Sequence, residues 1–233
     1  MQARLRRASD RIARMNESIQ TLTIYALPLL FAITVHEASH AYAARYLGDS
    51  TAYLQGRMTL NPIRHIDPIG TLLIPILLFV VGSPYLFGYA KPVPVEWGNL
   101  RKPKRDMGWV ALAGPASNLV MAFLWMVLWI VLWRMDIGEV FFLSMAEAGV
   151  MVNLVIFALN LFPIPPLDGG RIVTSLLPHH ASYRFAKLEP YGFFIILGLL
   201  FLGGLHYWLR PVMQVAYELI ALLVAPLKFL LGL

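Results

Sequence analysis

The sequence predicts an all-α polytopic membrane protein with about six transmembrane helices, and three observations support this fold class. Of the 233 residues, 58% are hydrophobic and only 14% are charged, whereas about a quarter of the residues of an average soluble domain are charged. The mean hydropathy is +0.65. Several apolar runs also lack Asp, Glu, Lys and Arg over the roughly 20 residues that a helix needs to cross a bilayer. A chain with so little charge cannot cover a water-facing surface.

The apolar runs give the positions of the expected spans. The first span should be kinked at Pro28, and the last is interrupted by Glu218 and Lys228. The six apolar runs that are expected to span or enter the membrane are residues 20–46, 68–90, 107–133, 146–163, 190–208 and 211–231.

The basic N-terminal stretch is expected to form an amphipathic helix on the membrane surface. The predicted organisation is therefore a basic segment over 1–18, a membrane core over 19–175 and C-terminal transmembrane helices over 176–233. The chain has no cysteine, which excludes disulfides and thiolate metal sites. Its net charge of +6 fits loops that face anionic lipid head groups. No nucleic-acid-binding motif accompanies that charge, so no nucleic-acid partner is expected.

Loop charge predicts an orientation in the membrane. Residues 45–106 carry eight Lys and Arg and residues 168–189 carry three, whereas the connector 134–147 carries only Arg134 beside acidic residues. Positively charged loops stay inside, so the first two regions are expected on the cytoplasmic side. The N-terminal arginines conflict with this orientation, because one crossing would place them on the opposite side.

An insertion after the first span separates two motifs that must meet near one face of the membrane. Residues 48–67 are rich in Thr, Tyr and turn residues and predict short strands or a loop. The run 68–90 should then either form a re-entrant hairpin or span and be followed by a return. The alternating KPVPV stretch at 91–95 could form an edge strand for an extended substrate, although Pro92 and Pro94 remove hydrogen-bond donors.

A short polar motif, HEASH at residues 36–40, lies near the end of the first span. Helical residues four apart are separated by about 400° of rotation and about 6 Å of rise, so His36 and His40 can bind one tetrahedral Zn²⁺. Glu37 lies beside them, placed to accept a proton from a metal-activated water. H-E-x-x-H on a helix is typical of zinc metalloproteases. It also occurs by chance on soluble helices, but an ionisable residue inside a span costs about 2.5–3.5 kcal/mol, which favours a functional role.

Asp168 is the candidate third ligand, because catalytic zinc usually has three protein ligands. It follows a proline-rich end of an apolar run, where the prolines prevent a regular helix. Gly169 and Gly170 allow close backbone approach. A carboxylate on non-helical backbone at membrane depth must face protein or a wet cavity, which suits a zinc ligand. The alternative is that Asp168 caps a helix beginning near Arg171.

Three ordered motifs resemble the site-2 protease family of intramembrane zinc metalloproteases. They are HEASH at 36–40, ALAGPASNL at 111–119 and NLFPIPPLDGG at 160–170. The resemblance covers most of residues 30–175, and the chain is most similar to compact prokaryotic members without PDZ or CBS domains. Several motifs in order are more specific than a single H-E-x-x-H.

The resemblance implies roles for five side chains. His36, His40 and Asp168 are expected to bind zinc, one ion per chain. Glu37 would be the general acid and base, and Asn160 would hold the substrate or the oxyanion. An amide N–H is a suitable oxyanion donor.

The resemblance also implies a function, a partner and a location. The implied reaction is hydrolysis of peptide bonds in or near the transmembrane helix of a single-pass membrane protein, within a lipid bilayer. The implied location is the prokaryotic plasma membrane, with the active site nearer the cytoplasmic face. Two alternatives are a membrane metal transporter and an inactive relative that acts as a scaffold for membrane proteins.

Other polar residues in the apolar sequence have weaker functional interpretations. Asn118, in the GPASN motif, is expected to line the core and to hydrogen bond between helices. Arg64 and His65 could shape an entry to the site, or they could be ordinary loop residues at the lipid interface. His179 and His180 are weaker candidates still.

Overall fold

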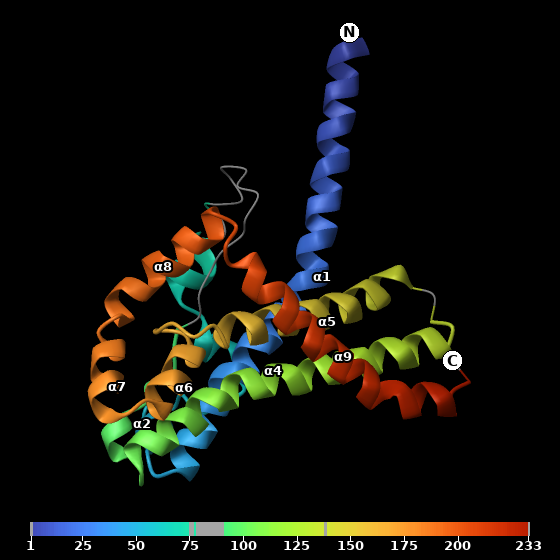
Figure 1. The fold of residues 1–233 in the computed structure, drawn as a ribbon. Coiled ribbons are helices and arrows are strands. Elements are labelled where there is room, and N and C mark those ends of the chain that lie inside the picture. Colours follow the sequence, from blue (N-terminus) through green and yellow to red (C-terminus); the bar gives the residue numbers. More distant parts are fainter. Residues whose placement is uncertain (1, 75–76, 78–90, 138, 233) are drawn as a thin grey trace.

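A computed structural model describes residues 2–74, 77, 91–137 and 139–232 (Figure 1). Within these residues all regular structure is helical and no strand occurs, which confirms the all-α class. The α-helices are α1 Gln2–Tyr46, α2 Thr51–Leu54, α4 Pro103–Arg134, α5 Val140–Asn160, α6 Asp168–Leu176, α7 His179–Ala186, α8 Glu189–Phe201 and α9 His206–Leu230. Three short turns of 3-10 or π type are η1 Pro62–His65, η2 Pro68–Leu73 and η3 Trp97–Asn99.

Four of the described helices are long and apolar enough to cross a membrane. They are residues Ile19–Tyr46 of α1 and the whole of α4, α5 and α9, and they coincide with the first, third, fourth and sixth expected spans. The expectation of a single span over 190–208 is not confirmed. Helix α8 has 13 residues, about 20 Å, which is shorter than the roughly 30 Å hydrocarbon core. It ends before Gly203, whose φ of 74° a side chain would disfavour.

The insertion after the first span forms helical turns rather than strands. The described part of 48–67 contains α2 and η1 and no strand, so the β-strand interpretation of this stretch is wrong. Most of 68–90 lies outside the described residues, and with it the choice between a re-entrant hairpin and a full span. Residues 91–96 have no regular secondary structure and no strand partner among the described residues.

Helix α1 is continuous from Gln2 through Pro28 to Tyr46. The backbone therefore has no break between the expected N-terminal segment and the first span, and Figure 1 shows the N-terminal half extending away from the other helices. The surface location expected for 1–18 stays a prediction.

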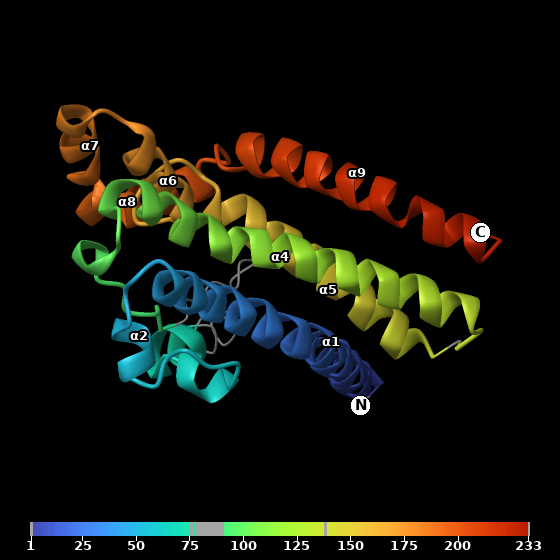
Figure 2. The same cartoon turned by 90° about the horizontal axis from the view of Figure 1, so that it is seen from below.

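Helix α4 lies at the centre of the fold and contacts α1, α5, α6 and α9. Figure 2 shows α1, α4, α5 and α9 side by side. Small residues permit this packing: a Cβ on Gly149 of α5 would lie 2.2 Å from the Trp125 ring of α4. The main apolar core lies between α4, α5 and α9; its buried members are Ala122, Trp125, Met126, Ile130, Ala146, Val150, Leu154, Ala216, Ile220 and Val224.

The end of α1 and the beginning of α4 lie together. Ala44 packs against Leu100 and Val110 in a small buried cluster, and the Arg101 N–H donates to the Leu47 carbonyl at 2.9 Å. At the opposite end of α4, the Arg134 Nε–H donates to the Leu231 carbonyl at 3.1 Å. The segment between α1 and α4 therefore starts and ends at the same end of this helix pair. This arrangement brings the HEASH and GPASN motifs together.

Candidate metal centre

Three side chains from α1 and α6 place one potential ligand atom each at a common point. The Nε2 atoms of His36 and His40 are 3.0 Å apart, and Asp168 Oδ2 lies 3.2 Å and 3.3 Å from them. These are the residues of a His–His–Asp group that can hold a metal ion. Zinc bonds of 2.0–2.1 Å in a tetrahedron separate ligand atoms by about 3.3 Å. The three distances between the ligand atoms therefore match a tetrahedral zinc site.

The outer nitrogen of each imidazole fixes its tautomer. His40 Nδ1 lies 2.8 Å from the Val110 carbonyl oxygen, which can only accept, so Nδ1 carries the proton. His36 Nδ1 lies 2.6 Å from Asn118 Oδ1 and donates in the same way. In the neutral form of each ring, Nε2 therefore directs a lone pair into the triangle, the form in which histidine binds metals.

With both rings in this form, the arrangement brings three electron-rich atoms together without a hydrogen between them. Asp168 Oδ2 is buried and has no hydrogen-bond partner, although it is within ion-pair distance of both rings. Unpaired polar atoms in a buried site are costly, and lone pairs about 3 Å apart repel. A cation between them removes both penalties, so the donor set fits zinc.

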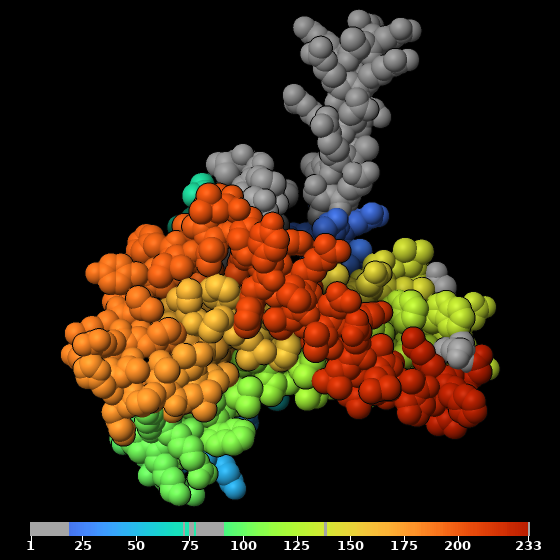
Figure 3. Space-filling model, viewed as in Figure 1, coloured from blue at the N-terminus to red at the C-terminus, as the bar shows by residue number. Residues whose placement is uncertain are grey.

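The loop before α6 places the Asp168 carboxylate. In Figure 3 this loop, gold in colour, lies at the surface, with α6, α7 and α8 on one side of it and α9 on the other. A Cβ on Gly169 would lie 2.3 Å from the Leu161 carbonyl oxygen, and one on Gly170 would lie 2.1 Å from Pro165 N. Helix α6 therefore begins against its own preceding loop only because both positions are glycine. The helix starts at Asp168 itself and its cap makes no side-chain bond, so the alternative of Asp168 as a capping residue is not supported.

Helix α4 covers the imidazoles through Gly114. A Cβ at this position would lie 2.4 Å from His40 Nε2 and 2.6 Å from His36 Cε1. The GPASN motif thus provides both the open backbone at Gly114 and the Asn118 amide one turn later.

Glu37 lies outside the His–His–Asp group and its carboxylate has its own partner. Glu37 Oε2 accepts a hydrogen bond of 2.8 Å from the Val93 N–H. Val93 belongs to residues 91–97, which we call the strap: the irregular residues 91–96 and Trp97, the first residue of η3. The KPVPV stretch therefore lies beside the proposed catalytic base.

Besides Glu37, the side chains of Arg57, Asp49 and Arg171 anchor the strap to the rest of the protein. The Arg57 guanidinium donates to the Lys91 carbonyl at 2.9 Å. Asp49 Oδ2 accepts from the Glu96 N–H at 2.9 Å. The Trp97 ring lies 4.9 Å from the Arg171 guanidinium carbon, and that guanidinium also pairs with Glu189 at 2.8 Å.

Asp49 is the most heavily bonded of these anchors. Burial alone raises the pKa of its carboxyl, but hydrogen bonds from the Thr51 hydroxyl, the Glu96 and Thr51 backbone N–H groups and the Asn99 amide outweigh that effect. The pKa of Asp49 therefore lies below its ordinary value. The carboxylate ties the end of α1 to the strap.

Asn160 donates an amide hydrogen to the Ile156 carbonyl at 3.0 Å. Its expected oxyanion role stays a prediction, and it would require the second amide hydrogen or a rotated side chain. His65 is buried and contacts the Thr59 carbonyl oxygen, while its own carbonyl accepts from the Lys91 N–H. His179 and His180 are exposed at the start of α7.

Asn153 is a buried polar residue that was not anticipated, as are Asp49 and Arg57. Asn153 lies on α5 and bonds to Asn118. Its signal in the sequence is an amide in an uncharged run, seven residues before Asn160.

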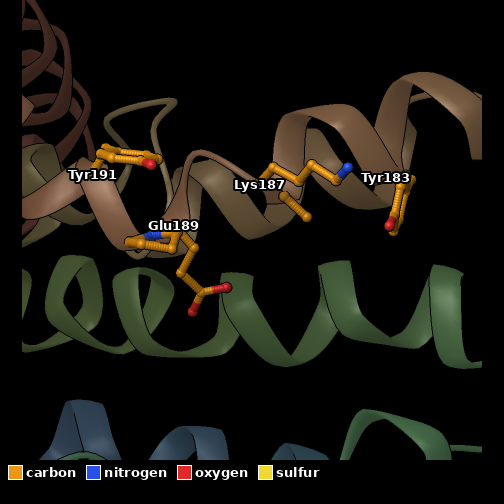
Figure 4. A pocket seen from close by; sticks show the side chains of 6 residues that line it. Tyr183, Lys187, Glu189 and Tyr191 are labelled. Atoms are coloured by element: carbon orange, nitrogen blue, oxygen red, sulfur yellow. The ribbon is translucent and has the colours of Figure 1, made fainter.

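A hollow of about 730 Å³ on α7 and α8 contains none of the proposed site residues. Figure 4 shows Tyr183, Lys187, Glu189 and Tyr191 along its wall. It is open and superficial, so the chemistry of the His–His–Asp group does not extend into it.

Known proteins match the sequence over most of its length. The profile of the family described as Peptidase family M50 matches residues 135–203. A Bacillus subtilis protein named "Putative zinc metalloprotease YwhC" is 39% identical over 189 residues, which cover 78% of this chain and 83% of that protein. A Mycolicibacterium smegmatis protein named "Putative zinc metalloprotease Rip2" is 32% identical over 179 residues, covering 77% of this chain and 67% of that protein.

A more distant relative is Stage IV sporulation protein FB of Bacillus subtilis, 27% identical over 178 residues, which cover 74% of this chain and 58% of that protein. No solved structure matches the chain at a comparable level of significance. The identity to the first two relatives, together with a His–His–Asp group that can bind a metal ion, settles the class of enzyme. The chain belongs to peptidase family M50, the site-2 protease family, and is a zinc metalloprotease with several apolar helices of a membrane protein.

Proposed function

We propose that this metalloprotease hydrolyses peptide bonds in or near the transmembrane segments of membrane-protein substrates. One observation carries the proposal: His36 and His40 of the His–His–Asp group lie on α1, within an apolar segment that is long enough to cross a membrane. His36 and His40 are ten and six residues before the end of the span at Tyr46, which is about 15 Å and 9 Å along the helix. A substrate bond must therefore reach membrane depth.

His36, His40 and Asp168 hold the zinc ion in this proposal. Zinc, when bound, supplies a Lewis acid that polarises the substrate carbonyl and lowers the pKa of water towards about 7. Glu37 takes the proton of the attacking water and delivers it to the leaving amine. The Val93 N–H holds one carboxylate oxygen of Glu37, which leaves the other free for the proton.

The substrate is a transmembrane helix of a single-pass protein, taken up from the bilayer. Its carbonyls are already hydrogen bonded within the helix, so the scissile region must unwind before attack. Asn160 then donates to the developing oxyanion. The membrane core over 19–175 carries all these residues, with the basic segment 1–18 before it and the helices of 176–233 after it.

The proposed location is the prokaryotic plasma membrane, with the active site nearer the cytoplasmic face. The basic stretches 45–106 and 168–189 support this orientation, because they adjoin the ends of α1 and α5 that lie beside the His–His–Asp group. Water then reaches the zinc from the cytoplasm.

The decisive experiment compares wild type with Glu37→Gln on a labelled membrane substrate, with zinc content measured in both. Loss of a general base should lower cleavage about 10²–10⁴-fold with zinc retained. Glu218→Gln is the matched control and should cleave like wild type, because Glu218 lies on α9 and, among the described residues, its side chain hydrogen bonds to Gln214 and not to the His–His–Asp group. Unchanged cleavage by Glu37→Gln would reject Glu37 as the base, and zinc flux across liposomes without cleavage would instead favour transport.

A further inference from the structure

Asn153 and Asn118 form a buried amide pair between α5 and α4. Both side chains are 0% exposed, and both lie in spans. A primary amide has two donor hydrogens and an acceptor oxygen, and in a buried site each must find a partner. The partners of these two amides lead directly to the proposed metal ligand His36.

The hydrogen bonds run in one direction along the pair. Asn153 Nδ2 donates to the Gly149 carbonyl at 2.8 Å. Asn153 Oδ1 accepts from Asn118 Nδ2 at 2.9 Å, and the same Nδ2 donates to the Ala32 carbonyl at 3.1 Å. Asn118 Oδ1 then accepts from His36 Nδ1 at 2.6 Å. Hydrogen bonds in such a chain polarise one another.

The direction of this series of hydrogen bonds decides whether His36 can bind a metal. With Asn118 Oδ1 towards the ring, Nδ1 carries the proton and Nε2 offers a lone pair to the site. If the Asn118 amide were reversed, its NH₂ group would face Nδ1. The proton would then move to Nε2 and point into the space between His40 and Asp168.

Two acceptors hold Asn118 in the productive orientation, and Asn153 provides one of them. The Ala32 carbonyl occupies one amide hydrogen, and Asn153 Oδ1 occupies the other. Asn153 is itself held by Gly149 within its own helix. Without Asn153 a buried N–H of Asn118 loses its partner, which weakens the preference for this orientation.

We propose that Asn153 is a positioning residue that acts through Asn118 to keep the metal-binding lone pair of His36 directed at the site. This inference rests on the proposed role of His36 as a zinc ligand. It deepens that role, because a residue on a third helix, α5, then controls which tautomer His36 adopts.

Two substitutions of nearly equal volume separate positioning from packing. Asn153→Leu keeps the shape and removes both hydrogen bonds. Asn153→Asp keeps them if the buried carboxyl is neutral, because its carbonyl oxygen accepts from Asn118 and its O–H donates to Gly149; a buried acid favours the neutral form. Leu154→Ala is the control, since it removes buried volume from α5 without touching the amide pair.

The measurement is metal affinity of the purified full chain in detergent, with Zn²⁺ titrated against a chelator and Co²⁺ absorption as a second readout. Outer partners of metal-binding histidines contribute about 10–100-fold in affinity. We expect Asn153→Leu to bind Zn²⁺ at least tenfold more weakly with an altered Co²⁺ spectrum, and Asn153→Asp to stay within about threefold of wild type. Leu154→Ala should lower thermal stability and leave affinity unchanged.

Wild-type affinity and spectrum in Asn153→Leu would overturn the inference. If the leucine variant does not fold, the smaller apolar Asn153→Val is tested in its place. Wild-type affinity and spectrum in that variant would likewise overturn the inference. Equal losses in the leucine, aspartate and Leu154→Ala variants would also reject a positioning role, because they would indicate packing alone. Failure of wild type to bind zinc would instead refute the proposed metal site itself.

Discussion

Gly114 is where helix α4 contacts the imidazoles of the proposed ligands. An added Cβ would lie 2.4 Å from His40 Nε2, far inside van der Waals contact. Either the helices move apart or the ring rotates, and both displace a ligand atom. The geometry of the His–His–Asp group therefore depends on position 114 having no side chain larger than that of glycine.

We predict that Gly114→Ala lowers Zn²⁺ affinity at least tenfold and reduces cleavage accordingly. The matched control is Gly198→Ala on α8, where an added Cβ meets no heavy atom within 4 Å. That control should bind zinc normally and gain a little stability, since alanine is favoured over glycine in a helix by up to about 1 kcal/mol. Zinc titration and thermal unfolding of both variants test this, and wild-type affinity in Gly114→Ala would contradict it.

Asp49 predicts a pH dependence of stability. Because the pKa of its carboxyl is lower in the folded protein than in the unfolded chain, its stabilising effect is present above the unfolded pKa of about 3.9 and is lost as pH falls through the folded value. Asp49→Asn keeps one acceptor oxygen but turns an NH₂ group towards a donor, so it should be less stable at pH 7 by about 1–3 kcal/mol.

Thermal unfolding between pH 7 and pH 3 measures this effect. The difference between wild type and Asp49→Asn should narrow below about pH 4. Asp136→Asn is the control, because Asp136 is exposed with φ of 52°, a conformation that asparagine also tolerates. A constant gap between wild type and Asp49→Asn down to pH 3 would refute the assignment.

At the scale of elements, the strap links the proposed base to three parts of the chain. It contacts Glu37 through Val93, the end of α1 through Asp49, and α6 with α8 through Arg171. The proposed base is thus held by backbone whose position depends on distant side chains.

The Val93 N–H gives the strap a testable role. Val93→Pro removes the donor and should lower kcat about tenfold or more, because a hydrogen bond to a charged group is worth about 1.5–3 kcal/mol. Val93→Ala keeps the N–H and should stay near wild type. Zinc content should not change in either variant. Cleavage of a labelled membrane substrate is the measurement, and equal activity of the two variants would argue against a role for this bond.

The sequence predicted the elements that follow from periodicity and motif spacing. The HEASH pair shares a helix face because its spacing is four residues. Asp168 was predicted as the third ligand because a carboxylate after three prolines in an apolar run is unusual, and the structure groups it with the two histidines. Four spans followed from hydropathy alone.

The missed features have physical reasons. Hydropathy does not register the break at Gly203 that ends α8. The Val93–Glu37 hydrogen bond uses a backbone N–H, which every residue except proline has. The residue type at position 93 therefore gives no indication of this bond. The Asn153–Asn118 pair depends on which faces of α4 and α5 meet, and their weak amphipathic pattern inside a membrane protein leaves that choice to packing.

At the scale of the whole molecule, the His–His–Asp group joins two elements far apart in sequence around the central α4. His36 and His40 come from α1 and Asp168 from α6, and both helices pack on α4. The polypeptide joins these elements only through long connections, so a bound ion acts as a cross-link at the core of the fold. Metal binding should therefore stabilise the protein as well as serve catalysis.

Removal of the metal should lower the stability of the whole molecule. A ligand at about 1,000 times its dissociation constant stabilises the folded state by about 4 kcal/mol, so a strong chelator should lower the Tm of wild type by several degrees, and added Zn²⁺ should restore it. Asp168→Ala removes one ligand, and its Tm should respond little to chelator or to zinc. The comparison uses thermal unfolding in detergent with and without chelator. If wild type and Asp168→Ala lost equal stability on chelation, the metal would act somewhere other than the His–His–Asp group.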